Sequence, residues 1–117
     1  MAKKIMVIDD DPNIVTYLTE LFQDNSYEVC SSPDGNGAME IVKRERPDLV
    51  TLDIEMPDEM GPKFFRELSG DKTFKNIPVI VISGVADAKY VVPKADAVVH
   101  KPFDREKLLK LVKDMIG

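Results

Sequence analysis

Short apolar runs that each end in a polar or charged residue constrain the fold of this chain more than any other feature. A continuous apolar run of strand length predicts a strand that helices cover on both faces of a sheet. One segment, Tyr27–Ser31, instead alternates apolar and polar residues, as a less buried edge strand does. Buried strands are predicted at Ile5–Ile8, Asp48–Asp53 and Val79–Ile82, and a further strand is predicted at Ala97–His100.

Segments with apolar residues at helical spacing separate these strands. Asp11 followed by Pro12 predicts a helix start, because Asp is a good N-cap and Pro suits the first helical position. This helix is expected to run to about Asp24, with Asn25 as a left-handed stop. Further helices are predicted between the turn at 32–35 and Pro47, at Pro62–Ser69, and after an Asp104 cap.

The alternation of strand and helix predicts an α/β fold, with a doubly wound, five-stranded parallel sheet that carries helices on both faces. The chain has 117 residues, so a single domain at 1–117 is expected. Ligands of doubly wound sheets bind beyond the carboxyl ends of the strands. The residues at those ends are Asp9, Asp10, Asp53, Ser83 and Lys101.

Three carboxylates, those of Asp9, Asp10 and Asp53, crowd at this predicted edge. Like charges at one place raise one another's pKa unless a cation lies among them. Oxygen ligands with room for water suit Mg²⁺, and a carboxylate can attack phosphorus to form an acyl phosphate. Lys101 would stabilise charge on the transferring phosphoryl oxygens, and the Ser83 hydroxyl would donate a hydrogen bond to one of them. We therefore expect Asp53 to be a nucleophile that accepts a phosphoryl group.

The charge balance and the apolar pattern argue against several classes of function. The chain has 16 Lys and Arg residues against 21 Asp and Glu, a formal net charge of −5, which disfavours non-specific nucleic-acid binding. No apolar run approaches the roughly 20 residues that span a bilayer, and the amino terminus lacks a signal-peptide core. Cys30 is the only cysteine, which excludes an internal disulfide and a Cys-based metal site. These features predict a cytoplasmic protein without nucleic-acid or membrane partners.

Taken together, the strand ends resemble the receiver domain of two-component response regulators, over essentially the whole chain. The resemblance implies the flavodoxin-like strand order 2-1-3-4-5 and a phosphoacceptor signalling switch rather than a metabolic enzyme. It implies a histidine kinase or phosphotransfer protein as donor and an output protein that the sequence does not identify, and it leaves a phosphorylation-dependent homodimer open. The matching motifs are Asp9-Asp10, Asp53 with Met56-Pro57 and Gly61, Ser83-Gly84, and Lys101-Pro102-Phe103.

Under this resemblance, the family's functional residues carry over to matching positions. Asp53 falls where receivers place the phosphoacceptor, Ser83 matches the switch hydroxyl, and Lys101 matches the active-site lysine. A Mg²⁺ ion would contact Asp10 and Asp53 directly and Asp9 through water.

The resemblance also implies a third metal ligand, and the sequence departs from the family pattern at several positions. The backbone carbonyl of Glu55 would be the third protein ligand of Mg²⁺, and the Glu55 side chain would add negative charge that changes the rate at which the acyl phosphate forms or hydrolyses. Val98 stands where receivers often have an aromatic residue, so coupling of the switch hydroxyl to an aromatic side chain is not expected. The segment Val85–Asp96, limited by Pro93, has room only for a shortened or irregular fourth helix. The Lys101-Pro102 peptide is expected to be cis.

Three alternatives remain open beside the phosphoacceptor. Val98 and the short 85–96 segment favour a phosphorylation-independent pseudo-receiver that acts as a protein-binding module. A flavin carrier would need a Ser/Thr/Gly-rich phosphate loop where Asp9-Asp10-Asp11 would repel the phosphate. A phosphatase of the haloacid-dehalogenase type would match the Asp53-Ile54-Glu55 spacing but needs a larger chain with a cap. His100, the only histidine, is expected to be a packed or edge residue.

Overall fold

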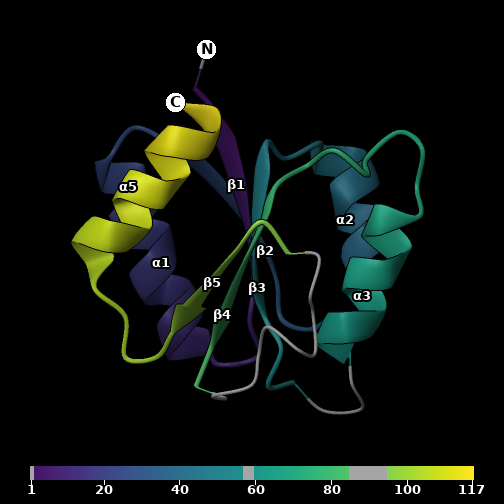
Figure 1. Ribbon diagram of the computed structural model, residues 1–117, viewed down its shortest axis with the longest axis horizontal. Coiled ribbons are helices and arrows are strands. Elements are labelled where there is room, and N and C mark those ends of the chain that lie inside the picture. The colour runs from purple at the N-terminus through teal and green to yellow at the C-terminus, as the bar shows by residue number, and fades with distance from the viewer. Residues whose placement is uncertain (1, 57–59, 85–94) are drawn as a thin grey trace.

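The computed structural model describes residues 2–56, 60–84 and 95–117, and forms a parallel sheet between two pairs of helices (Figure 1). The strands are β1 (Lys4–Ile8), β2 (Glu28–Ser32), β3 (Leu49–Asp53), β4 (Val79–Ser83) and β5 (Ala97–His100). The helices are α1 (Pro12–Asp24), α2 (Ala38–Glu45), α3 (Met60–Ser69) and α5 (Arg105–Ile116). The predicted fourth helix falls at 85–96, most of which lies outside the described residues.

The strand order is β2-β1-β3-β4-β5, and every neighbouring pair is parallel, which confirms the predicted fold and order. The chain passes from β1 outward to β2, and then returns to the other side of β1 to form β3. The winding therefore reverses between β1 and β3, which is the point where doubly wound sheets bind their ligands.

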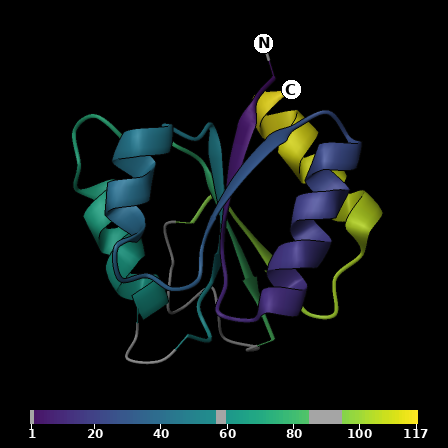
Figure 2. The same ribbon diagram turned by 180° about the vertical axis from the view of Figure 1, so that it is seen from behind.

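In the described part of the chain, each face of the sheet packs against two helices, as Figures 1 and 2 show from opposite sides. Alternate strand residues contribute to the two cores, because successive side chains of a strand point to opposite faces. The core under α2 and α3 includes Met6, Val50 and Val81, together with Val42 and Phe64 of the helices. The core under α1 and α5 includes Ile5, Leu49, Ile80, Phe22 and Leu108.

Two capping predictions are confirmed. The Asp11 side chain accepts a hydrogen bond from the Asn13 amide at 2.9 Å at the start of α1, and Pro12 is the first helical residue. The Asp104 side chain accepts from the amides of Glu106 and Lys107 at the start of α5. Both helices therefore begin with a satisfied terminal amide, a few residues beyond the carboxyl ends of β1 and β5.

The predicted left-handed stop of α1 is wrong at Asn25, which has φ −107°. Ser26 takes the left-handed conformation instead, with φ 71°. The Asn25 side-chain amide donates to the Leu21 carbonyl at 2.8 Å, so this residue caps the helix through its side chain. The turn places Tyr27 edge-on to Phe22, with ring centroids 6.4 Å apart. Tyr27 is thus buried before the sheet begins, and β2 starts one residue later than predicted.

The third helix begins at Met60, two residues before the predicted Pro62. Proline is tolerated in the first turn of a helix, where its missing N–H would have no helical partner. Gly61 lets this turn approach the end of β3, because a Cβ atom here would lie 2.9 Å from the Asp53 carbonyl oxygen. A side chain at position 61 would therefore push α3 away from the strand that carries Asp53.

The two ends of the chain lie close together, at the edge of the sheet opposite to the carboxyl ends of the strands (Figure 1). Ala2, Lys3 and Gly117 line one shallow surface pocket. None of the helices in the described part of the chain is long and apolar enough to cross a membrane.

Candidate functional site

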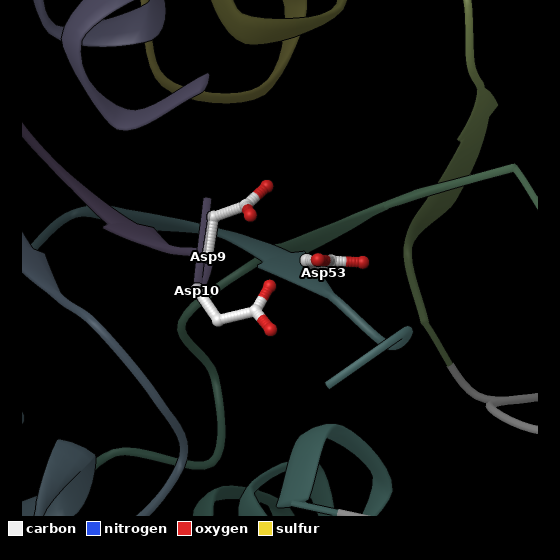
Figure 3. A group of neighbouring side chains, drawn as sticks. All are labelled: Asp9, Asp10 and Asp53. Atoms are coloured by element: carbon white, nitrogen blue, oxygen red, sulfur yellow. The ribbon is translucent and has the colours of Figure 1, made fainter. Parts of the chain in front are cut away.

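Three aspartates from two neighbouring strands come together at the carboxyl edge of the sheet (Figure 3). Asp9 and Asp10 follow β1, and Asp53 is the last residue of β3. One carboxylate oxygen of each residue lies within 4.8 Å of the other two. Pairing of Ile8 with Leu52 produces this proximity, because each strand then presents its next residue at the same level. Asp9 and Asp53 are buried and Asp10 is exposed.

Within the described residues, one ammonium group faces the buried carboxylates. The Lys101 Nζ atom lies 3.7 Å from Asp9 Oδ2 and 3.8 Å from Asp53 Oδ2. Its side chain is 25% exposed, so water screens these contacts only in part. The backbone amide of Lys101 donates to the Ser83 carbonyl at 2.8 Å, which ties this residue to the end of β4. The Lys101-Pro102 peptide is cis, as the resemblance implied.

Burial raises the pKa of the Asp53 carboxyl from its usual value of 3.8 to about 6, and the neighbouring Asp9 carboxylate raises it as well. The Glu55 backbone amide acts in the opposite direction, since it donates to Asp53 Oδ1 at 2.9 Å and favours the charged form. Lys101 also lowers this pKa. The carboxylate therefore remains mostly ionised at neutral pH, with Oδ1 engaged by an amide and Oδ2 facing the ammonium group.

Ser83 is the last residue of β4 and is fully buried. The pairing of Asp53 with Ile82 puts Ser83 one position beyond the Asp53 level of the sheet. All five residues predicted at the strand ends thus lie at one edge of the sheet. His100 ends β5 and is exposed, in keeping with the prediction of an edge residue.

The contacts of the Glu55 side chain are the part of the site that the sequence does not predict. Its Oε2 atom accepts a hydrogen bond from the Gly84 backbone amide at 2.9 Å and lies 3.9 Å from Lys101 Nζ. The sequence prediction treated this side chain only as added negative charge near the site. The available signal was an acidic residue two positions after Asp53 together with a glycine after Ser83, which leaves room for a carboxylate to approach the backbone.

The donor set fits a magnesium ion. The cluster consists of oxygen donors, combines buried and exposed carboxylates, and has one member open to water. Mg²⁺ prefers one or two carboxylates, retains several waters and avoids closed protein cages. Asp9, Asp10 and Asp53 can therefore hold such an ion.

The chain matches the model of the response regulator receiver domain over residues 5–113. It belongs to this family. Receivers are signalling domains of two-component systems rather than metabolic enzymes, they bind Mg²⁺ at an acidic pocket, and they act downstream of histidine kinases or phosphotransfer proteins. The aspartate cluster at the edge of the sheet matches such a pocket.

Similar proteins contain the receiver domain alone and as part of longer chains. Protein Rrf1 of Nitratidesulfovibrio vulgaris is 37% identical over 112 residues, which are 96% of this chain and 81% of the relative. The DNA-binding response regulator MtrA of Mycolicibacterium smegmatis is 32% identical over 97% of this chain but only 50% of the relative. The crystal structure of chemotaxis protein CheY4 of Vibrio cholerae has a TM-score of 0.89 and 25% identity, and the match covers 99% of this chain and 100% of CheY4.

Proposed function

We propose that residues 1–117 act as one receiver domain, in the cytoplasm, that accepts a phosphoryl group on Asp53 and regulates a partner protein. The observation that carries this proposal is the position of Asp53 Oδ2. This oxygen is buried, lies 3.8 Å from the Lys101 ammonium and is next to two further aspartates. The second oxygen is already held by the Glu55 amide, so Oδ2 is the oxygen that attacks.

The phosphoryl donor is a phosphohistidine of a histidine kinase or phosphotransfer protein. Asp53 Oδ2 forms a new O–P bond while the P–N bond of the phosphohistidine breaks, and the imidazole leaves with the bond's electron pair and takes up a proton. Lys101 stabilises the charge that spreads over the phosphoryl oxygens, and the Ser83 hydroxyl donates a hydrogen bond to one of them. Asp53 must be ionised to attack, and its pKa of about 6 allows this at neutral pH.

Asp9, Asp10, Asp53 and the Glu55 backbone carbonyl would hold a Mg²⁺ ion, which would supply positive charge beside the phosphoryl oxygens. The protein's contribution is to hold the carboxylates in place. Asp9 Oδ1 accepts from the Asp11 amide at 2.9 Å, and Asp53 Oδ1 accepts from the Glu55 amide at 2.9 Å. These two bonds fix the orientation of the buried carboxylates, because each leaves only one oxygen to face the cluster.

Phosphorylation adds charge at one strand end, and this charge shifts an equilibrium between two conformations toward the form that binds the output protein. The domain acts on its own Asp53 and later loses the phosphoryl group to water, so it modifies itself and does not turn over a metabolite. Phosphorylation-dependent association of two copies is one form that this output could take.

Intact mass after incubation with acetyl phosphate and Mg²⁺ tests the proposal. The parent should gain one phosphoryl group, whereas Asp53→Ala and the parent with excess chelator should gain none. Asp48→Ala is a matched control, because Asp48 lies next to the other end of the same strand and should leave labelling intact. A parent chain that gains no phosphoryl group would contradict the proposal and favour a phosphorylation-independent binding module.

A further inference from the structure

The Glu55 carboxylate connects three segments that are far apart in the sequence. Glu55 lies in the link after β3, Gly84 directly follows β4, and Lys101 directly follows β5. The Glu55 Oε2 atom accepts from the Gly84 amide at 2.9 Å, and it lies 3.9 Å from Lys101 Nζ. A Cβ atom at Gly84 would lie 3.3 Å from Glu55 Oε1, a tight contact that the glycine avoids.

The Lys101 ammonium group also lies near Asp53 Oδ2, the oxygen that is proposed to carry the phosphoryl group. Lys101 Nζ lies 3.8 Å from Asp53 Oδ2 and 3.9 Å from Glu55 Oε2. A phosphoryl group bonded to this oxygen would bring three charged oxygens into the space beside Lys101. Those oxygens need hydrogen-bond donors, because an unpaired charge in a partly buried site is costly. Besides the Ser83 hydroxyl, two such donors are close to Glu55: the Gly84 amide donates to its Oε2 atom, and the Lys101 ammonium lies 3.9 Å from the same atom.

We propose that the Glu55 carboxylate is an internal anion that occupies the phosphoryl-binding donors, and that a phosphoryl group on Asp53 displaces it. The inference rests on the proposed function of Asp53. In the unphosphorylated chain the Gly84 amide binds the Glu55 carboxylate, and in the phosphorylated chain it binds a phosphoryl oxygen. Glu55 thereby makes every anion that reaches the site compete with a carboxylate that is already bound.

Exposure distinguishes Glu55 from the other carboxylates near Lys101. Its side chain is 37% exposed, whereas the side chains of Asp9 and Asp53 are 3% exposed. A partly exposed glutamate can rotate into water and recover its hydration, but a buried aspartate cannot leave the site without moving the backbone. Glu55 is therefore the carboxylate that an incoming anion can replace.

Beryllofluoride in the presence of Mg²⁺ is a suitable probe, because it binds a carboxylate oxygen as a non-hydrolysable mimic of a phosphoryl group. The affinity of the parent chain is compared with that of Glu55→Ala, Glu55→Asp and Glu55→Gln. Glu67→Gln, on the exposed side of α3, is the control for a general change of charge. Asp53→Asn lacks the carboxylate that binds beryllofluoride, so any affinity that it retains measures binding at other places on the protein. The Gly84 amide resonance, followed by NMR, reports directly on the hydrogen bond.

Glu55→Ala should bind beryllofluoride about tenfold more tightly than the parent, as the loss of one competing hydrogen bond to a charged group predicts. Glu55→Asp keeps the charge but is one methylene shorter, so it should also bind more tightly than the parent. Glu55→Gln keeps the length without the charge and should fall between the parent and Glu55→Ala. Glu55→Ala without beryllofluoride should already shift the Gly84 amide resonance, and Glu67→Gln should change nothing.

Tight binding by the parent, with the same affinity in Glu55→Ala, would overturn this inference and leave the proposed function intact. A gain in Glu55→Ala and Glu55→Gln without any gain in Glu55→Asp would also overturn it, because net charge alone would then explain the effect. An unmoved Gly84 resonance in Glu55→Ala would have the same meaning. Failure of all variants and the parent to bind beryllofluoride would reject the proposed function together with the inference.

Discussion

The two ends of the sheet both carry aspartates, in opposite arrangements. At the amino end, Asp48 Oδ2 accepts a hydrogen bond from the Lys4 amide at 2.8 Å, and Asp96 Oδ2 accepts from the Val79 amide at 2.8 Å. At the carboxyl end, the buried carboxylates of Asp9 and Asp53 share one ammonium group. Aspartate therefore completes the backbone hydrogen bonding of the strands at one end and accumulates negative charge at the other.

The difference shows which carboxylates favour folding and which oppose it. An aspartate that accepts a strand amide replaces water without bringing like charges together. A buried aspartate beside another carboxylate loses hydration and is repelled as well, which is why the Asp53 pKa is raised. The carboxyl end of the sheet is therefore a place where stability is lost to keep a site for positive charge.

Of the predicted changes in stability, the one caused by Mg²⁺ binding at the carboxyl end of the sheet should be at least as large as any other. At a concentration about a hundredfold above its dissociation constant, the ion should stabilise the folded parent by about 3 kcal/mol. Thermal unfolding with and without Mg²⁺ measures the shift. Asp48→Ala should respond like the parent, and Asp10→Asn and Asp53→Asn should lose most of the response. An equal response in Asp10→Asn would place the ion elsewhere.

Replacement of Asp53 by asparagine should stabilise the metal-free chain at pH 7 by about 3 kcal/mol, because the Asp53 pKa rises from 3.8 to about 6 and one pKa unit corresponds to about 1.4 kcal/mol. The folded parent holds the Asp53 proton more tightly than the unfolded parent, so its stability falls as pH rises from about 4 through 6. The gain in Asp53→Asn should thus be absent below pH 4 and complete above pH 6. Urea unfolding across this range measures it, and a gain that does not change with pH would contradict the burial of a charged group.

Asp48→Ala should have the opposite effect on stability and should destabilise the chain by about 1 kcal/mol, because the Lys4 amide loses its acceptor. Denaturant unfolding at pH 7 without metal gives this value, and Asp48→Asn is the control, since its side-chain oxygen can still accept the bond. A stabilised Asp48→Ala chain would mean that both ends of the sheet concentrate charge in the same way.

The smallest predicted effect concerns Thr51, which lies between Asp48 and Asp53 in the chain. Its Oγ1 atom is the only buried side-chain polar atom without a hydrogen-bond partner within residues 2–56, 60–84 and 95–117. Thr51→Val should stabilise the chain by about 0.5–1 kcal/mol, because it removes an unsatisfied hydroxyl from a β-branched side chain of similar shape. Thr51→Ser keeps the hydroxyl and should not stabilise. A less stable Thr51→Val chain would show that the hydroxyl has a partner in solution.

The sheet and its charged edge could be predicted from sequence because both follow from local patterns. Apolar runs indicate buried strands, and parallel alternation brings their carboxyl ends together, so Asp53, Ser83 and Lys101 were expected at one edge. The contact of Glu55 with Gly84 could not be predicted, because it joins residues 29 positions apart and depends on the path of the link after β3.

The errors in local structure have similar causes. The sequence predicts Pro62 as the start of α3, but packing of the preceding Gly61 against β3 allows the helix to begin at Met60. Asn25 was expected to turn left-handed, but its side chain bonds to the Leu21 carbonyl and Ser26 makes the turn. In the first case packing against a neighbouring strand decided the backbone conformation, and in the second case a local side-chain hydrogen bond did.

The shallow pocket shared by Ala2, Lys3 and Gly117 implies that the order of the elements along the chain can be rearranged. A short glycine-rich linker could join the present ends, and new ends could be opened in the exposed part of the link between α3 and β4. The strands would keep their neighbours and the aspartate cluster would be unchanged. Such a circular permutant would carry its ends beside α3, where a fused reporter could follow a change at Asp53 that reaches this helix through Gly61.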